Sequence, residues 1–224
     1  MNATVRQDNQ PITCGIFYCR DSAEIKGCGS LQTSSWLDSD MLRNRQQKHT
    51  AIRCDANWHV LDYGAGTGNL LLYILPKVAH ITAMDNSDGM LTVLQSKIPT
   101  LYSHKVQLLK HHADTEELPK DAYNLIMSSM TLHHIQNTKE FIIQCYNALK
   151  PGGLLVLIDL CKEDGTFHKD LDSTIHHFGF DLEHVTEIFT SVRLKTITIH
   201  EFYAIYKEHV NKHFPVFFAI AKKQ

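Results

Sequence analysis

The sequence lacks any apolar run of the roughly 20 residues that a membrane-spanning helix needs. It also lacks a basic excess, because its formal net charge is -2 and its pI is about 6.7, whereas nucleic-acid-binding domains typically exceed about 9. The amino terminus does not show the basic and then apolar pattern of a secretory signal. We therefore expect a cytoplasmic protein with neither a membrane nor a nucleic-acid partner.

No Cys-x-x-Cys pair occurs among the six cysteines, which argues against a zinc ribbon and against a thioredoxin-like site. Cys14, Cys19 and Cys28 lie close together in the sequence. We expect free thiols in a reducing compartment, and a metal or redox role for this group of three is the alternative.

The length of 224 residues fits one domain with a short additional segment. Residues 1–35 are polar and show little apolar periodicity, so we expect a lead-in or lid there. Residues 36–53 have a helical pattern, and Ser39 can cap its start. We expect residues 36–224 to form the principal domain.

Strands and helices alternate from residue 59 onward. The expected strands are 59–63, 80–85, 106–112, 123–129, 154–160, 193–206 and 214–221. The expected helices are 69–77, 89–98 and 138–149. This alternation predicts an α/β fold whose parallel sheet is covered by helices on both faces. No helix is evident between the last two strands, so we expect them to form an antiparallel pair joined by residues 207–213.

A glycine-rich turn follows the first expected strand. Gly64, Gly66 and Gly68 have the spacing Gly-x-Gly-x-Gly, and glycines at such a turn let the backbone approach a ligand closely. Dinucleotide-binding proteins use Gly-x-Gly-x-x-Gly instead, and the position of its third glycine is Asn69 here. This mismatch argues against a nicotinamide or flavin cofactor.

Two acidic residues accompany this turn. Asp62 precedes the first glycine by two residues, as in the methyltransferase motif Asp-x-Gly-x-Gly-x-Gly, which this segment resembles. A carboxylate there suits the ammonium and sulfonium groups of S-adenosylmethionine and would repel a pyrophosphate. Asp85 ends the second expected strand, where an acid can accept hydrogen bonds from both ribose hydroxyls.

Further segments extend the resemblance across residues 59–224. They are Asp85–Leu91, His112–Pro119, Ser128–Ile135 and Leu149–Gly153. Together they are similar to class I S-adenosylmethionine-dependent methyltransferases, and most of all to small-molecule methyltransferases related to the ubiquinone and menaquinone biosynthesis enzymes. The resemblance implies a Rossmann-like, doubly wound, seven-stranded and mostly parallel sheet that ends in an antiparallel strand pair.

The resemblance also implies a donor site. In that family, Met90 would lie near the adenine and Asp114 would accept its amino group. The complete set of implied donor-binding residues is Asp62, Gly64, Ala65, Gly66, Gly68, Asp85, Asn86, Met90, Asp114, Thr115 and Ser129.

Histidines are the candidates for acid–base chemistry on the acceptor. His133, His134 and His168 follow the fourth and fifth expected strands, whose carboxyl ends form the ligand-binding edge of such sheets. His133 is our first choice for a general base, and His176 and His177 are further candidates. A structural role for each is the alternative. We expect no metal, although a metal held by this cluster, with Glu163 or Asp164, remains an alternative.

The acceptor is expected to be a small molecule, and methylation at O, N, C or S stays open. Amide and exocyclic-amine methyltransferases tend to carry Asn-Pro-Pro-Tyr where this chain has Ser128–Thr131, which argues against DNA adenine and protein glutamine. The alternatives are an RNA or protein methyltransferase, a non-catalytic S-adenosylmethionine-binding protein, and a nicotinamide-dependent oxidoreductase. We expect a monomer or homodimer.

Overall fold

The computed structural model describes residue 52, residues 54–169 and residues 173–224. The predicted lead-in over 1–35 lies outside these residues, as does nearly all of the predicted helix over 36–53. Residues 56–224 form one compact unit. Within the part of the chain so described, no helix is long and apolar enough to span a membrane.

A seven-stranded sheet with the order β3-β2-β1-β4-β5-β7-β6 forms the centre of this unit. The strands are β1 (His59–Tyr63), β2 (His80–Asp85), β3 (Val106–Lys110), β4 (Tyr123–Ser129), β5 (Leu149–Leu160), β6 (Leu194–Lys207) and β7 (Lys212–Lys223). Strands β1 to β5 pair in parallel, and β7 runs antiparallel to both of its neighbours, β5 and β6. The predicted Rossmann-like sheet with a terminal antiparallel pair is therefore confirmed.

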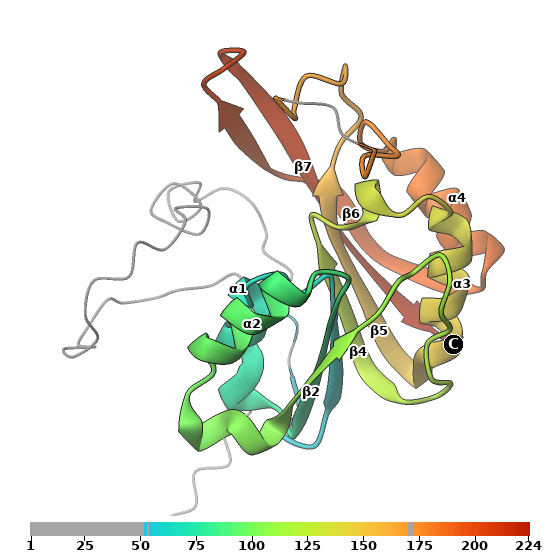
Figure 1. The fold of residues 1–224 in the computed structure, drawn as a ribbon. Coiled ribbons are helices and arrows are strands. Elements are labelled where there is room, and N and C mark those ends of the chain that lie inside the picture. The colour runs from blue at the N-terminus through green and yellow to red at the C-terminus, as the bar shows by residue number, and fades with distance from the viewer. Residues whose placement is uncertain (1–51, 53, 170–172) are drawn as a thin grey trace, which may run out of the picture. The chain divides into compact units, whose positions relative to one another are not determined.

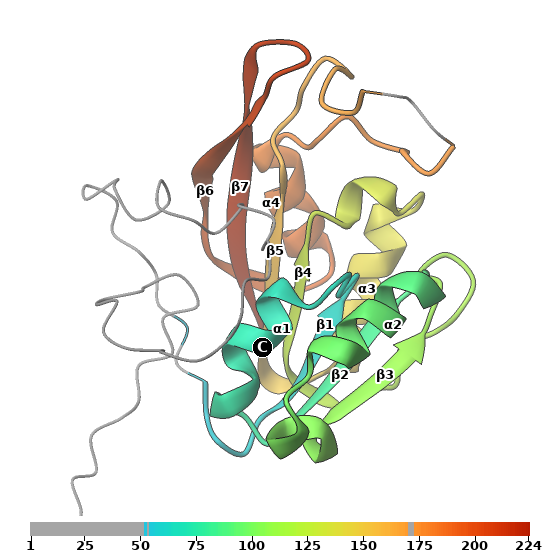
Figure 2. The same ribbon diagram turned by 60° about the vertical axis from the view of Figure 1, so that its left-hand side comes forward.

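Helices cover both faces of the sheet, with α1 and α2 on one face and α3 and α4 on the other (Figures 1 and 2). The helices are α1 (Asn69–Ile74), α2 (Asp88–Lys97), α3 (Thr138–Ala148) and α4 (Leu182–Ser191), with short 3-10 turns η2 (Leu75–Lys77), η3 (Thr100–Lys105) and η4 (Leu132–His134). Strands buried on both faces must be apolar along their length. Most interior residues of β1 and β4 meet this requirement, and Leu61, Leu125 and Ile126 are fully buried, whereas the buried polar residues Asp62 and Ser128 lie near the carboxyl ends of these strands.

Several predicted boundaries differ from the structure; those of β6, β7, α2 and α3 differ by only one or two residues. Strand β3 ends at Lys110 rather than His112, and α1 ends at Ile74, where Pro76 lies within the 3-10 turn η2. Strand β5 begins at Leu149, not at residue 154, so the Lys150–Gly153 stop signal lies inside the strand. The pairing of β5 with β4 shifts register there, between Tyr123 and Leu125. The Lys150–Gly153 segment thus interrupts the pairing of β5 with β4 without ending β5.

Helix α4 is absent from the elements predicted from the sequence. Its residues Val185, Ile188 and Phe189 are buried in the main hydrophobic core, while its opposite side is exposed. Their spacing of three and four residues is that of one helical face. The periodic signal was therefore present, although the Asp181 side chain that precedes the helix makes no capping hydrogen bond.

Replacing Phe189 tests whether α4 is an integral part of the core. Phe189→Ala should lower the free energy of unfolding by about 3–5 kcal/mol, because it leaves a cavity in a fully buried site. Urea denaturation followed by circular dichroism measures this loss. Glu187→Ala on the exposed side of the same helix is the control and should change stability by less than about 0.5 kcal/mol. Equal effects of the two variants would contradict the packing of α4.

Candidate active site

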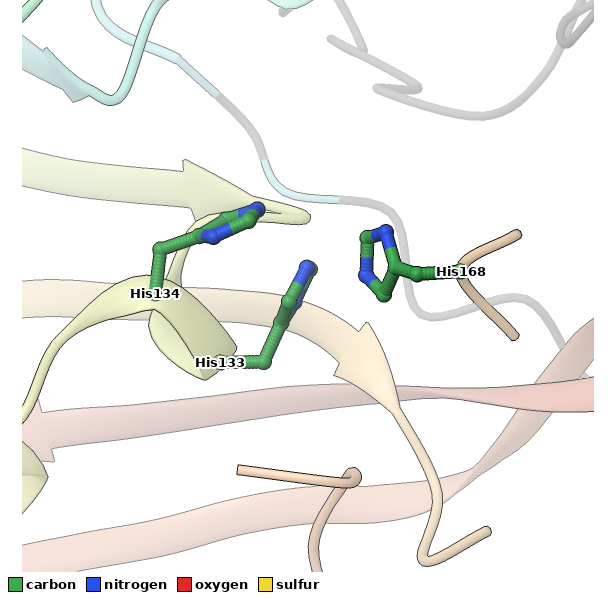
Figure 3. A group of neighbouring side chains, drawn as sticks. All are labelled: His133, His134 and His168. Carbon is green, nitrogen blue, oxygen red and sulfur yellow. The ribbon is translucent and has the colours of Figure 1, made fainter. Parts of the chain in front are cut away.

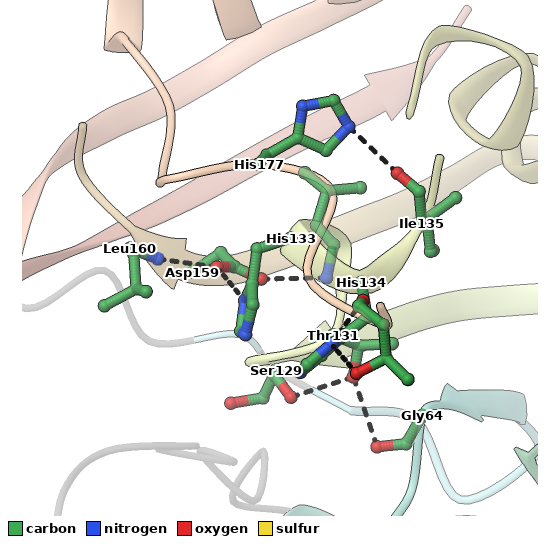
Figure 4. Close-up of polar contacts among 11 residues, drawn as sticks. Gly64, Ser129, Thr131, His133, His134, Ile135, Asp159, Leu160 and His177 are labelled. Atoms are coloured by element: carbon green, nitrogen blue, oxygen red, sulfur yellow. Dashed lines mark hydrogen bonds and ion pairs between the residues drawn. The ribbon is translucent and has the colours of Figure 1, made fainter. Parts of the chain in front are cut away.

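The carboxyl ends of the five parallel strands bring the predicted site residues to one edge of the sheet. The segments that follow β1, β4 and β5 meet there, and the Thr131 hydroxyl lies within hydrogen-bonding distance of two carbonyl oxygens, that of Ser129 at 3.1 Å and that of Gly64 at 3.4 Å (Figure 4). Ligands of open α/β sheets bind at this edge. The structure therefore places the glycine turn next to the histidines that follow β4.

Asp85 organises the glycine turn. Its Oδ2 accepts the backbone N–H of Gly66 at 2.8 Å, and its Oδ1 accepts that of Ser87 at 2.9 Å. The carbonyl of Met84 accepts the N–H groups of Gly64 and Ala65. A carboxylate has about four acceptor positions, so Asp85 retains capacity for ribose hydroxyls while it holds the loop.

The three glycines of the turn differ in what a side chain at each position would contact. All three have positive φ, but a Cβ at Gly64 would overlap Thr131 and a Cβ at Gly68 would overlap Leu94. A Cβ at Gly66 would meet no atom of the described residues within 4 Å. Gly64 and Gly68 are thus required by packing within the protein. Gly66 instead borders open space, as expected where a ligand lies against the backbone.

Asp62 is a buried acid directly before this turn, with only 2% of its surface exposed. Its Oδ2 has no hydrogen-bond partner among the residues that the structure describes. Burial raises the pKa of the carboxyl to about 7, a hydrogen bond from the backbone of Leu71 opposes this rise, and the charge of Asp85 adds to it. A buried carboxylate oxygen without a hydrogen-bond partner costs free energy that a cationic ligand would recover.

The remaining predicted donor-binding residues lie around the same edge. Asn86 and Met90 are exposed next to the turn, and Ser129 ends β4. Asp114 accepts the backbone N–H groups of Gln136 and Asn137, so its carboxylate also fixes the start of α3. The roles of these residues, and of Ala65 and Thr115, in binding a donor stay predictions.

His133 is held by a buried acid. Its Nδ1 lies 2.7 Å from Oδ1 of Asp159, and the two residues are only 1% and 0% exposed. The Asp159 carboxylate also accepts the backbone N–H groups of Leu132 and Leu160. Three donors therefore satisfy the charge, and the carboxylate fixes the orientation of the imidazole.

The other predicted histidines divide into two groups. His134 and His168 lie beside His133, with ring centroids 4.1 and 5.3 Å from its own (Figure 3). His177 instead donates from Nε2 to the carbonyl of Ile135 at 3.0 Å, which is a structural contact. His176 is exposed. The first three candidates thus form one cluster, and the last two do not join it.

Two residues of this region were not predicted as site residues. Asp159 is the one acid in the apolar run of β5, and a buried acid requires partners, so its position carried a signal. Thr131 had no such signal, because only the fold brings it against Gly64.

Comparison with known proteins identifies the family. A family model described as a methyltransferase domain matches residues 35–200, which is about three quarters of the chain. The chain therefore belongs to this methyltransferase-domain family.

Individual relatives are more distant. The chain is 25% identical to an uncharacterized methyltransferase of Schizosaccharomyces pombe over 62% of this chain and 54% of the relative. It is 25% identical to a demethylmenaquinone methyltransferase of Listeria welshimeri over 51% of this chain and 50% of the relative. The chain thus spans about half the length of these curated relatives.

A solved structure shares the fold. Haemonchus contortus phosphoethanolamine N-methyltransferase 2, in complex with S-adenosyl-L-methionine, superposes with a TM-score of 0.63 at 18% identity, covering 76% of this chain and 49% of that one. This similarity shows the fold alone.

Gly66 offers a direct test of the open space beside the turn. Gly66→Val should abolish S-adenosylmethionine binding, because its side chain would project into that space. Isothermal titration calorimetry measures the loss. Gly152→Val is the matched control, since Gly152 also has a positive φ but its Cβ site meets only the side chain of Lys222. Both variants should lose about 1–2 kcal/mol of stability, and normal binding by folded Gly66→Val would place the donor elsewhere.

From the raised pKa of the Asp62 carboxyl we expect donor binding to depend on pH. With a pKa of about 7, the carboxyl is mostly protonated below neutral pH, whereas an ammonium ligand favours the ionised form. Binding must then release a proton, so affinity should rise about fivefold to tenfold from pH 6 to pH 7.5. Calorimetry in two buffers with different ionisation enthalpies detects the released proton. Asp62→Asn should bind more weakly and lose this pH dependence; a variant with the same dependence would refute the assignment.

Proposed function

We propose that this chain transfers a methyl group from S-adenosylmethionine to a small-molecule acceptor. The observation that carries the proposal is the open space at Gly66 together with the buried carboxyl of Asp62 just before the turn, one oxygen of which has no partner among the described residues. A ligand that fills the space beside Gly66 and brings a cationic group to the Asp62 carboxyl fits both features. The named activities of the curated relatives are consistent with this donor.

The residues of the turn have distinct tasks in this proposal. Gly66 lets the donor lie against the backbone, and Asp62 binds its ammonium group. Asp85 holds the turn and accepts the ribose hydroxyls. When bound, the sulfonium supplies an activated methyl group, so the protein mainly positions the two reactants and excludes water. Orientation of this kind contributes roughly 7–11 kcal/mol to a barrier.

The acceptor is proposed to bind at the cluster of His133, His134 and His168. Thr131 links the segment after β4 to the glycine turn, which brings this cluster to the donor side of the sheet. The hydrogen bond between Asp159 and Nδ1 of His133 turns Nε2 of that ring away from the carboxylate. A small molecule is favoured because the relatives' printed names include quinone and phosphoethanolamine methyltransferases.

Replacing Asp85 tests the donor assignment. Asp85→Ala removes the ribose acceptor and the support of the Gly66 N–H, so affinity for S-adenosylmethionine should fall by about 10- to 100-fold, or about 1.5–3 kcal/mol. Asp88→Ala, which removes a neighbouring exposed acid paired with Lys110, is the control and should bind normally. Unchanged calorimetric affinity of Asp85→Ala would contradict the proposal.

Turnover separates an enzyme from a binding protein. Labelled S-adenosylmethionine incubated with the protein and a metabolite extract should yield S-adenosylhomocysteine and a labelled small molecule. Donor binding without any product over a broad set of extracts would instead identify a non-catalytic binder. Binding of a nicotinamide cofactor in place of S-adenosylmethionine would identify the oxidoreductase alternative.

A further inference from the structure

Three imidazole rings meet at the carboxyl ends of β4 and β5. His133 and His134 lie in the short turn η4, and His168 comes from the segment that follows β5. One ring nitrogen from each lies within 4.8 Å of the other two. Figure 3 shows the three rings turned toward one another across a short gap. Residues far apart in the sequence thus place three potential metal ligands together.

Hydrogen bonds fix the orientation of two of these rings. Nδ1 of His133 lies 2.7 Å from the Asp159 carboxylate, and Nδ1 of His134 lies 2.8 Å from the carbonyl oxygen of Thr174. Both oxygens are acceptors, so each Nδ1 carries the proton and each Nε2 presents a lone pair. Metal-binding histidines show this arrangement, in which carboxylates or backbone carbonyls hold the nitrogen that does not bind the metal.

The number of rings favours a metal over a single general base. Proton abstraction needs one imidazole, whereas three converging rings match the three-histidine ligand set that leaves a fourth position open on zinc. Zn–N bonds of about 2.0–2.1 Å in a tetrahedral site place the nitrogens about 3.3 Å apart. The rings therefore need to approach one another by at most about 1.5 Å.

The two carboxylates of Glu163 and Asp164 are engaged in other contacts. Glu163 accepts the backbone N–H groups of Gly165 and Phe167, and Asp164 binds Thr166 and Lys212. These bonds shape the segment that carries His168. Among the described residues the ligand set is therefore three imidazoles, with Asp159 supporting one of them, and it favours a borderline transition metal over calcium or magnesium.

We propose that His133, His134 and His168 bind a divalent transition-metal ion of the zinc type and leave one coordination position open. The role of the metal rests on the proposed function: the open coordination position would take an oxygen or sulfur atom of the methyl acceptor. The acceptor's O–H or S–H would lose its proton to water on binding. Its lone pair then forms the new bond to the methyl carbon as the bond from that carbon to the sulfonium breaks, which leaves a neutral thioether.

Titration of the chelator-treated, full-length protein with Co²⁺ tests this site. One equivalent should bind and give the visible absorption bands of a four- or five-coordinate ion, and Zn²⁺ should displace it. Asp159→Asn should lower Co²⁺ affinity by about 10- to 100-fold, as loss of an outer-shell partner does. His133→Ala, His134→Ala and His168→Ala should each lower it at least as much.

His184→Ala is the control, because His184 is an exposed histidine on α4 that pairs with Glu187. It should leave the stoichiometry and spectrum unchanged. His168 lies on a half-exposed segment, so its replacement should preserve the fold even if the buried variants do not. Wild-type affinity and spectrum in folded His168→Ala, or no Co²⁺ binding by the folded wild-type protein, would overturn the proposal.

Donor calorimetry separates this inference from the proposed function. A normal Co²⁺ spectrum in a protein that does not bind S-adenosylmethionine would support the metal site and refute methyl transfer. Methyl transfer at the full rate by metal-free protein would support the proposed function and overturn the role of the metal. Loss of turnover on chelation, restored by Zn²⁺ or Co²⁺, would support both.

Discussion

The arrangement of the histidine cluster, where we propose that the acceptor binds, depends on the hydrogen bonds of the buried Asp159 carboxylate. This carboxylate is fully buried in β5 and accepts hydrogen bonds from Leu132, His133 and Leu160. An isolated charge at this depth would cost several kcal/mol, and three donors offset that cost. The same bonds tie the segment after β4 to β5 and fix the tautomer of His133. Burial of one charge therefore sets both the backbone path and the chemistry of the imidazole.

At the glycine turn, where we propose that the donor binds, two acids differ in how far hydrogen bonds satisfy them. Asp85 is satisfied by backbone N–H groups of the turn, whereas one oxygen of Asp62 is buried without a partner in the described structure. The first acid stabilises the loop as it stands, and the second stores an unfavourable energy that a cation can relieve. Two carboxylates on neighbouring strands thus differ in their surroundings, and in the proposed function Asp85 shapes the turn while Asp62 would bind the cationic group of the ligand.

Much of the fold was predictable, because its signals are local. The apolar runs of β1, β2 and β4 predicted the boundaries that these strands have in the structure. Because no helical pattern lies between the last two strands, their antiparallel pairing was also predictable. Helix α4 was missed although its apolar spacing is regular. The start of β5 was misplaced because the Pro-Gly-Gly turn, normally a break, interrupts the pairing inside a continuing strand.

The sequence by itself determined the glycine turn, its two acids and the histidines as candidates, since residue type and spacing define their chemistry. Only the tertiary structure decided which of them work together. It distinguished the open surroundings of Gly66 from the packed surroundings of Gly64 and Gly68. It also brought His168 next to His133 and His134, more than thirty residues away in the sequence, and it showed that His177 contacts a backbone carbonyl. The physical reason is that a parallel sheet brings the ends of distant strands to one edge, and no local pattern records which side chains meet there.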